Sequence, residues 1–436
     1  MRRVLGFADL FVIAAASIGP AFSLATTFGA MVGAGGSGTP LALLLVTAVM
    51  ACVAAAYRRL GERYPNAGSS YSWVRVAFGP VAGAYAAWVL IVANVFAVVA
   101  TAVPAGTYTL ALIAPVLADR PLADALAGTV WVCAAGALLY AGLRPTARVT
   151  SALLVAELLV LALVAGAALL QPVAEHAAAR AAAPPASGLI AALVIGIWMI
   201  DGWEVSASAA EESADAARAP GAGGLAGLLL SAAVLWLCMT AFLRVGTLDG
   251  FAAHEGDAMA YVGAALGGNA WRVALSVTVL VSLAASLQTT LIYLTRSFFA
   301  MGRDGVLPDA LGALDRRAQP ARAIVVMTAL GMGFTLASGL SPTLKDAFAF
   351  ILSGTSVFLG LLFALSAAAA VRVFARDRAA LLDGVVLPGV ATAVLLAVLG
   401  ASVVGDDPGI RAFIGIAAGA GLPLAWWRGR ASAAAI

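Results

Sequence analysis

Three carboxyl groups stand in the middle of long apolar stretches of this sequence. Glu157 lies in the segment LVAEL (154–158), and Asp201 and Glu204 lie in the segment WMIDGWE (198–204). Burial in a low-dielectric setting penalises a charged carboxylate, so such a group takes up a proton or a cationic partner. Because basic residues lie near the ends of these stretches, the acids offer two kinds of chemistry: proton uptake and binding of an amine.

The composition places these acids inside a membrane. The chain has 436 residues, of which 63% are hydrophobic and only 11% are charged. A soluble domain of this size needs a denser charged coat, whereas a lipid bilayer suits the composition. The net charge of +3 comes with no basic patch interleaved with aromatic residues, so no nucleic-acid partner is predicted.

The apolar runs predict an all-α membrane protein with twelve spans and no soluble domain. About 20 residues are needed to cross the hydrocarbon of a bilayer. The predicted spans are 7–31, 40–60, 80–113, 121–141, 148–170, 188–211, 222–245, 270–298, 322–340, 344–371, 382–403 and 409–427. The first is too long for the apolar core of a signal peptide. Residues 1–436 would form one membrane domain, and 7–170 and 188–371 would be two inverted repeats followed by two helices at 382–427.

Basic residues set the predicted orientation. With the N-terminus inside, most of the 25 basic residues fall in inner loops, as positively charged loops of membrane proteins do. Both termini are therefore predicted to be cytoplasmic, in a bacterial inner membrane. The cysteines Cys52, Cys133 and Cys238 lie far apart in apolar runs, so they are interpreted as packing residues rather than metal ligands or a disulfide. No cofactor is expected.

Two spans are predicted to break at mid-membrane. Gly19-Pro20 disfavours a continuous helix in span 7–31, because both residues weaken helix and proline removes a donor. The amides of the next residues would then form a positive helix N-terminus for a carboxylate; the alternative is a simple proline kink. The candidate binding residues here are Ser17, Ile18, Gly19, Ala21, Phe22 and Ser23.

The second predicted break carries the acidic segment of span 188–211. Two acids, a glycine and two tryptophans at mid-membrane are hard to explain by packing, although a misplaced span boundary is the alternative. The candidates for substrate binding are Trp198, Asp201, Gly202 and Trp203 from this segment and Asn94 from span 80–113. The candidates for proton coupling or gating are Glu157, Glu204, Ser282 and Ser286. The hydroxyl groups of the two serines could instead serve helix packing.

Three motifs in register resemble the amino acid–polyamine–organocation (APC) superfamily of permeases. The segment RSFFAMGRDGVLP (296–308) resembles the family signature that follows span 270–298, and IWMIDGWEVSASAAEES (197–213) resembles the family's interrupted sixth helix. The segment RRLGERYPNAGSSYSWVRVAFG (58–79) resembles the loop after the second helix. The resemblance covers roughly residues 5–375 and continues more loosely to the end.

The resemblance implies a fold and several roles. It implies a five-plus-five inverted repeat with two further helices, and transport by alternating access. Trp198 matches the family's aromatic gate over the substrate, and Glu204 matches an acidic residue of gating or protonation. Glu157 falls where some relatives carry a lysine that replaces a bound sodium ion. Since the charge is reversed here, the lysine mechanism does not carry over, and proton and sodium coupling both stay open.

The sequence leaves two transport hypotheses, and a membrane enzyme is the functional class to weigh against them. The first is a secondary transporter of amino acids, coupled to protons or working by exchange. The alternative is a permease for cationic amines, polyamine-like or ethanolamine-like, which the acid surplus favours, as does Gly19-Pro20-Ala21 where relatives often have Gly-x-Gly. A membrane enzyme is not indicated, because His176 and His254 lie in outer loops without a catalytic partner motif. The oligomeric state stays open.

Overall fold

The structure is a computed structural model that describes residues 1–172, 186–341, 344–405 and 407–434. His176 lies outside these described residues. Within them the chain is helical, and its extended pairing amounts to an isolated bridge between Leu5 and Ser213. The predicted all-α membrane architecture is confirmed.

The helices follow the predicted spans closely. The first half of the chain contains α1 (Phe7–Ile18), α2 (Pro20–Gly35), α3 (Thr39–Arg63), α4 (Ser69–Phe78), α5 (Pro80–Ile113), α6 (Pro121–Ala141) and α7 (Leu143–Leu170). The second contains α8 (Ala186–Met199), α9 (Val205–Ser208), α10 (Ala219–Val245), α11 (Leu248–Ala253), α12 (Ala258–Gly267), α13 (Asn269–Arg303), α14 (Ala321–Ser338) and α15 (Leu344–Phe374). The chain ends with α16 (Leu387–Gly405) and α17 (Pro408–Ala434).

Proline and length explain where these helices begin and how far they reach. Pro20, Pro80, Pro121 and Pro408 each open a helix, a position where the missing N–H has no helical acceptor to lose. Ten helical stretches in the described ranges are long and apolar enough to cross a membrane. The first, Phe7–Arg63, combines two predicted spans, and the part of 188–211 that forms α8 is shorter than that length. The count of twelve crossings stays a prediction.

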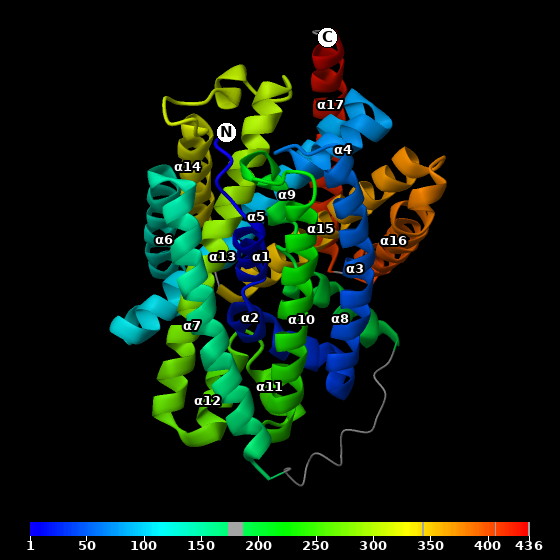
Figure 1. Cartoon of the computed structure of the whole chain (residues 1–436). Coiled ribbons are helices and arrows are strands. Elements are labelled where there is room, and N and C mark those ends of the chain that lie inside the picture. Colours follow the sequence, from blue (N-terminus) through cyan, green and yellow to red (C-terminus); the bar gives the residue numbers. More distant parts are fainter. Residues whose placement is uncertain (173–185, 342–343, 406, 435–436) are drawn as a thin grey trace.

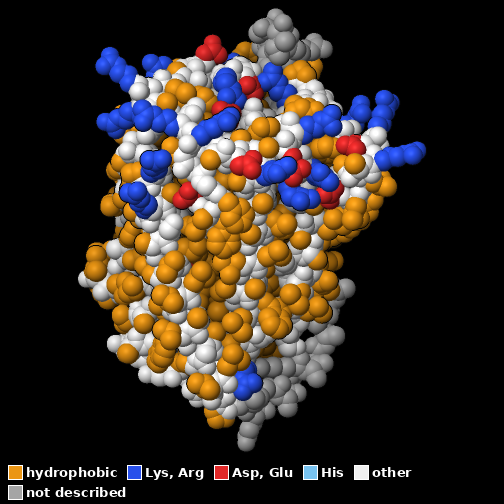
Figure 2. All heavy atoms as spheres, viewed as in Figure 1, with side chains coloured by type: hydrophobic (Ala, Val, Ile, Leu, Met, Phe, Trp, Pro, Cys, Tyr) orange, Lys and Arg blue, Asp and Glu red, His pale blue; other side chains and the backbone are white. Residues whose placement is uncertain are grey.

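Helix α5 forms the centre of the bundle (Figure 1). In its most apolar stretch 83% of the residues are buried, compared with 17% in α17. Helix α5 packs against α6, α13, α15 and α17. The outer helices expose leucines and valines over a broad belt that carries few charged side chains in the view of Figure 2. Such an apolar surface fits lipid and not water.

The charged side chains gather at one end of the molecule. The N-terminal segment and the C-terminal end of α17 both lie at this end (Figure 1), and most of the Lys and Arg side chains visible in Figure 2 lie there too. This arrangement agrees with an excess of basic residues on one side of a membrane. That this side is the cytoplasmic one stays a prediction.

Hydrogen bonds and ion pairs tie the helices together near the charged end. The N-terminal segment bonds to the stretch after α9, since the amides of Val4 and Leu5 donate to the Glu212 carbonyl at 2.8 and 3.0 Å. The Glu212 side chain forms a buried, two-bond ion pair with Arg296 of α13. A more exposed pair joins Arg303 to Glu211. These contacts fix α1 and α9 to α13 on this side of the bundle.

Candidate functional site

The first predicted break lies at Gly19. Helix α1 ends at Ile18, Gly19 has φ of 59° in the left-handed region, and α2 starts at Pro20. Glycine reaches this conformation without the steric cost that a Cβ atom imposes. Pro20 then starts a new helix, because its ring prevents the preceding turn from continuing through it.

The second break lies between α8 and α9. Residues 200–204 form turns, and Gly202 has φ of 112°. A Cβ atom on Gly202 would stand 2.7 Å from Ser17 Oγ and 2.9 Å from the Ser17 carbonyl oxygen. The two interrupted segments therefore touch each other, at residues that the sequence places at mid-span.

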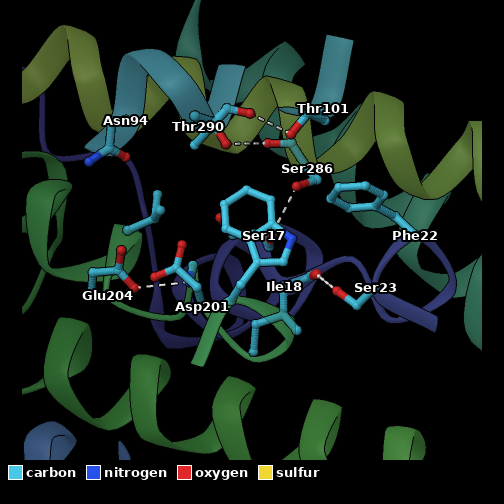
Figure 3. Close-up of a pocket in the computed structure, with 14 residues that line it drawn as sticks. Ser17, Ile18, Phe22, Ser23, Asn94, Thr101, Asp201, Glu204, Ser286 and Thr290 are labelled. Atoms are coloured by element: carbon cyan, nitrogen blue, oxygen red, sulfur yellow. Dashed lines mark hydrogen bonds between the residues drawn. The ribbon is translucent and has the colours of Figure 1, made fainter. Parts of the chain in front are cut away.

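A small cavity lies where the breaks meet (Figure 3). Its volume is about 20 Å³, which is room for about one water molecule. Residues from α1, α2, α5, α8, α9, α13 and the second break surround it. The lining consists of Ser17, Ile18, Phe22, Ser23, Asn94, Ala97, Thr101, Trp198, Asp201, Gly202, Glu204, Val205, Ser286 and Thr290.

Two carboxyl groups face this cavity from the second break (Figure 3). Glu204 is 1% exposed, and its Oε2 accepts a hydrogen bond from the Gly202 amide at 3.1 Å. Asp201 Oδ1 is buried and has no hydrogen-bond partner among the described residues. No Lys, Arg or His belongs to the lining set. Two neighbouring acids with no basic partner suit a cation or a proton between them.

An aromatic pair forms another part of the wall. Phe22 and Trp198 meet edge to face, with ring centroids 6.4 Å apart and planes at 89°. Both rings line the cavity that Asp201 and Glu204 also face. Aromatic faces attract ammonium groups through their quadrupole, so the rings and the acids favour the same kind of ligand.

The wall opposite the breaks is polar and includes residues that the sequence analysis missed. Asn94 and Ser286 were predicted, whereas Ala97, Thr101 and Thr290 on this wall, and Val205 beside the second break, were not. Helical spacing contains the signal for three of the four: Ala97 and Thr101 follow Asn94 by three and seven positions, and Thr290 follows Ser286 by four. Residues at these spacings share one face of a helix.

Glu157 lies beside the first break and outside the cavity lining. Its Oε1 accepts hydrogen bonds from the Ala21 amide at 2.7 Å and from the Ser282 hydroxyl at 2.8 Å. The Ser282 oxygen in turn accepts from the Phe22 amide at 3.1 Å. The structure thus brings Glu157 and Ser282 together at the start of α2.

This arrangement changes the predicted role of the α2 N-terminus. The sequence predicts free amides at Ala21, Phe22 and Ser23, ready for a substrate carboxylate. In the structure the first two bond to Glu157 and Ser282, and the Ser23 amide donates to the Gly19 carbonyl at 2.8 Å. The expectation of free amides is therefore wrong, because a carboxylate of the protein already lies there.

Three other predicted site residues do not line the cavity. Gly19 and Ala21 form the backbone of the break but are absent from the lining set. Trp203 is 1% exposed and packs between Tyr57 of α3 and Phe363 of α15, at centroid distances of 5.0 and 5.8 Å. Trp198 lines the cavity, whereas Trp203 packs against aromatic rings of the protein core.

No group of three or more His, Cys, Asp or Glu side chains in the described part of the chain has an arrangement that could hold a metal ion. The cavity offers acceptor oxygens, two acids and two aromatic rings.

A comparison with known protein families finds one that matches most of this chain. The family model described as "Amino acid permease" matches residues 5–411. Uncharacterized transporters of Mycobacterium bovis and of two strains of Mycobacterium tuberculosis are 33% identical over 169 residues, which is 38% of this chain. The match spans about a third, 36%, of the length of these curated relatives.

A solved structure shares the fold. The crystal structure of MhsT in complex with L-phenylalanine superposes with a TM-score of 0.64 and covers 90% of this chain and 98% of MhsT. At 17% sequence identity, this similarity concerns the fold alone.

Proposed function

Because the chain belongs to the amino acid permease family, we propose that it is a secondary active transporter of small solutes that carry an amino group. Amino acids are the first candidate substrates and cationic amines are the second. The family and the fold are those of membrane transporters. In this proposal the chain lies in the cytoplasmic membrane with both termini inside, and the solute binds where the two broken helices meet.

The cavity between the two breaks carries this proposal. Irregular backbone at membrane depth is tolerated where it lines a polar cavity, and binding sites of many secondary transporters lie at broken helices near the midplane. Here the breaks at Gly19 and Gly202 meet beside Asp201 and Glu204. An ammonium group placed between two acids and the Phe22 and Trp198 rings would neutralise buried charge, which gives binding free energy.

The size of the cavity supports alternating access. A space of about 20 Å³ holds about one water molecule, so a solute binds only after helices move apart. Helices α1 and α9 are the elements joined to α13 through Glu212 and Arg296 near the charged end. Release of those contacts would open a path from that end, while α2 and α11 pack on the other side.

Proton coupling is assigned to two carboxyl groups with different positions. Glu204 faces the cavity, so a proton on it would change how strongly a cationic solute binds. Glu157 joins α7 to α2 and α13 through Ala21 and Ser282, and its Oε2 is buried without a hydrogen-bond partner among the described residues. A proton there would weaken the acceptor that joins these helices, and so would favour their separation.

Uptake into proteoliposomes tests the proposal. Amino acids and amines are offered with and without an imposed pH gradient, and the gradient is expected to accelerate uptake of the transported solute. Glu204→Gln should remove the pH dependence, and Glu157→Gln should reduce it. Glu62→Gln, at a partly exposed ion pair with Arg59, is the matched control and should behave as wild type.

Two outcomes would contradict the proposal. Wild-type uptake that is indifferent to the pH gradient rules out proton coupling. Absence of both uptake and exchange for every amino acid and amine, with folded protein in the vesicles, rules out transport of this solute class.

A further inference from the structure

The anion-binding position at the start of α2 is occupied by the protein itself. A helix N-terminus attracts an anion through its free amides and its dipole. In α2 the first residue is Pro20, which has no N–H, and the next amide, Ala21, donates to Glu157 at 2.7 Å. The Phe22 amide is bonded to Ser282. A solute carboxylate would therefore find no free amide here and would meet the Glu157 carboxyl group.

Four of the five hydroxyl groups that line the cavity are oriented as acceptors. Each hydroxyl has one hydrogen to donate and two lone pairs. Thr101 donates to the Ala97 carbonyl, Ser286 to the Ser17 carbonyl, Thr290 to the Ser286 carbonyl and Ser23 to the Ile18 carbonyl, at 2.7–2.9 Å. With their hydrogens committed to the backbone, these four hydroxyls present lone pairs to a ligand.

The remaining lining reinforces this pattern. Asp201 and Glu204 add carboxyl oxygens, and the lining set has no basic side chain. Asn94 uses one amide hydrogen on the Leu90 carbonyl at 3.0 Å. Its second amide hydrogen, the Ser17 hydroxyl and the Trp198 indole N–H are the donors left on the wall, and all three are neutral. An ammonium group has three N–H donors and matches such a wall, whereas a carboxylate needs donors and would face two acids.

We propose that the substrate is an organic cation, a primary amine or diamine that bears no carboxylate, because Glu157 fills the carboxylate position and the cavity wall presents acceptors. This inference rests on the proposed transport function and narrows it to one solute class. Phe22 and Trp198 would enclose the ammonium group, and the acids would neutralise it. The carbon chain of the amine would contact Ile18 and Val205, the apolar part of the lining.

Solute pairs that differ in the carboxylate test this inference. The pairs are ethanolamine with serine, 1,4-diaminobutane with ornithine, and agmatine with arginine. Thermal-shift titration of the purified full-length protein and counterflow in proteoliposomes are measured for each pair. The amine is expected to act at a concentration at least about tenfold lower than its amino acid, which corresponds to about 1.4 kcal/mol or more.

A variant provides the second arm. Glu157→Ala frees the Ala21 amide at the start of α2, so it should lower the tenfold preference by improving the response to the amino acid of each pair. Thr129→Ala in α6 is the control and should keep the wild-type preference, because the buried Thr129 hydroxyl bonds to the Ala125 carbonyl of its own helix and lies outside the cavity lining. Intrinsic Trp fluorescence and the melting temperature in the absence of solute show whether each variant is folded. If Glu157→Ala does not fold, Glu157→Gln replaces it. The side-chain oxygen of the introduced glutamine would still accept from the Ala21 amide, so this variant should keep the preference for the amine of each pair.

The outcomes separate this inference from the function it rests on. Stronger binding and faster counterflow of the amino acid in the wild-type protein would overturn the inference and leave the transport function standing. A wild-type protein that neither binds nor moves any of the six compounds would overturn the transport function itself.

Discussion

Gly202 lies directly against Ser17, so that the backbone of the second break touches the last turn of α1. A Cβ atom on Gly202 would be 2.8 Å from the Ser17 carbonyl carbon, closer than carbon atoms pack. The φ of 112° at Gly202 is also a conformation that residues with a Cβ atom avoid. The contact between the two interrupted helices therefore depends on the absence of a side chain at this position.

Gly202→Ala is expected to separate the two breaks and to abolish transport. The strain of a Cβ atom at this φ and the clash with Ser17 together amount to about 1–3 kcal/mol, which should lower the melting temperature by a few degrees. Gly166→Ala in α7 is the control, because nothing lies within 4 Å of a Cβ atom there. Uptake and thermal unfolding are measured for both; full transport by Gly202→Ala would contradict this account of the site.

Asp201→Asn is expected to discriminate between the two solute classes. The amide keeps the size of the side chain but removes the negative charge that an ammonium group would neutralise. Transport of a diamine should fall to background, whereas a neutral amino acid, if it is transported, should be spared. Asp309→Asn, in the exposed stretch after α13, should leave uptake unchanged. Undiminished diamine uptake by Asp201→Asn would remove Asp201 from the site.

The two tryptophans of the second break should respond differently to substitution. Trp198→Leu removes an aromatic face of the cavity, and loss of a cation–π contact of about 0.5–2 kcal/mol should weaken amine binding roughly 2–30-fold. Trp203→Leu removes a ring stacked on Phe363, so it should lower the melting temperature more and the affinity of the folded protein less. Titration and thermal unfolding of both variants check this contrast. The reverse pattern would mean that Trp203, not Trp198, faces the solute.

The buried ion pair between Arg296 and Glu212 should be far more sensitive than the neighbouring exposed pair. The Arg296 and Glu212 side chains are 1% and 5% exposed. Arg296→Met therefore leaves a buried unpaired carboxylate and should destabilise the protein by about 3–5 kcal/mol. Arg303→Met, at a pair with side chains 37% and 21% exposed, should cost about 1 kcal/mol or less.

A double variant separates the charge from the packing at this pair. Arg296→Met combined with Glu212→Gln should recover part of the stability, since the buried charge is then gone. Thermal unfolding in detergent measures all of these variants. Equal losses for Arg296→Met and Arg303→Met would contradict the burial that the structure assigns to Arg296.

The sequence alone predicts the helices and the two breaks well. Apolar runs of about 20 residues define spans because the bilayer has a fixed thickness, and Gly19-Pro20 and the acidic segment 198–204 interrupt them for local steric and electrostatic reasons. These are properties of neighbouring residues in the chain, so no knowledge of the packing is needed. The same patterns single out Asp201 and Glu204, which do face the cavity.

Only the tertiary structure decides which groups satisfy one another across the bundle. The bond from Ala21 to Glu157 joins residues 136 positions apart, and no local pattern shows that the amides predicted to be free are already taken. The different surroundings of Trp198 and Trp203 likewise depend on how the turn at Gly202 packs against Ser17. Hydrogen-bond partners and side-chain directions follow from the packing of distant helices, and these contacts place the Glu157 carboxyl group where the sequence predicted free amides.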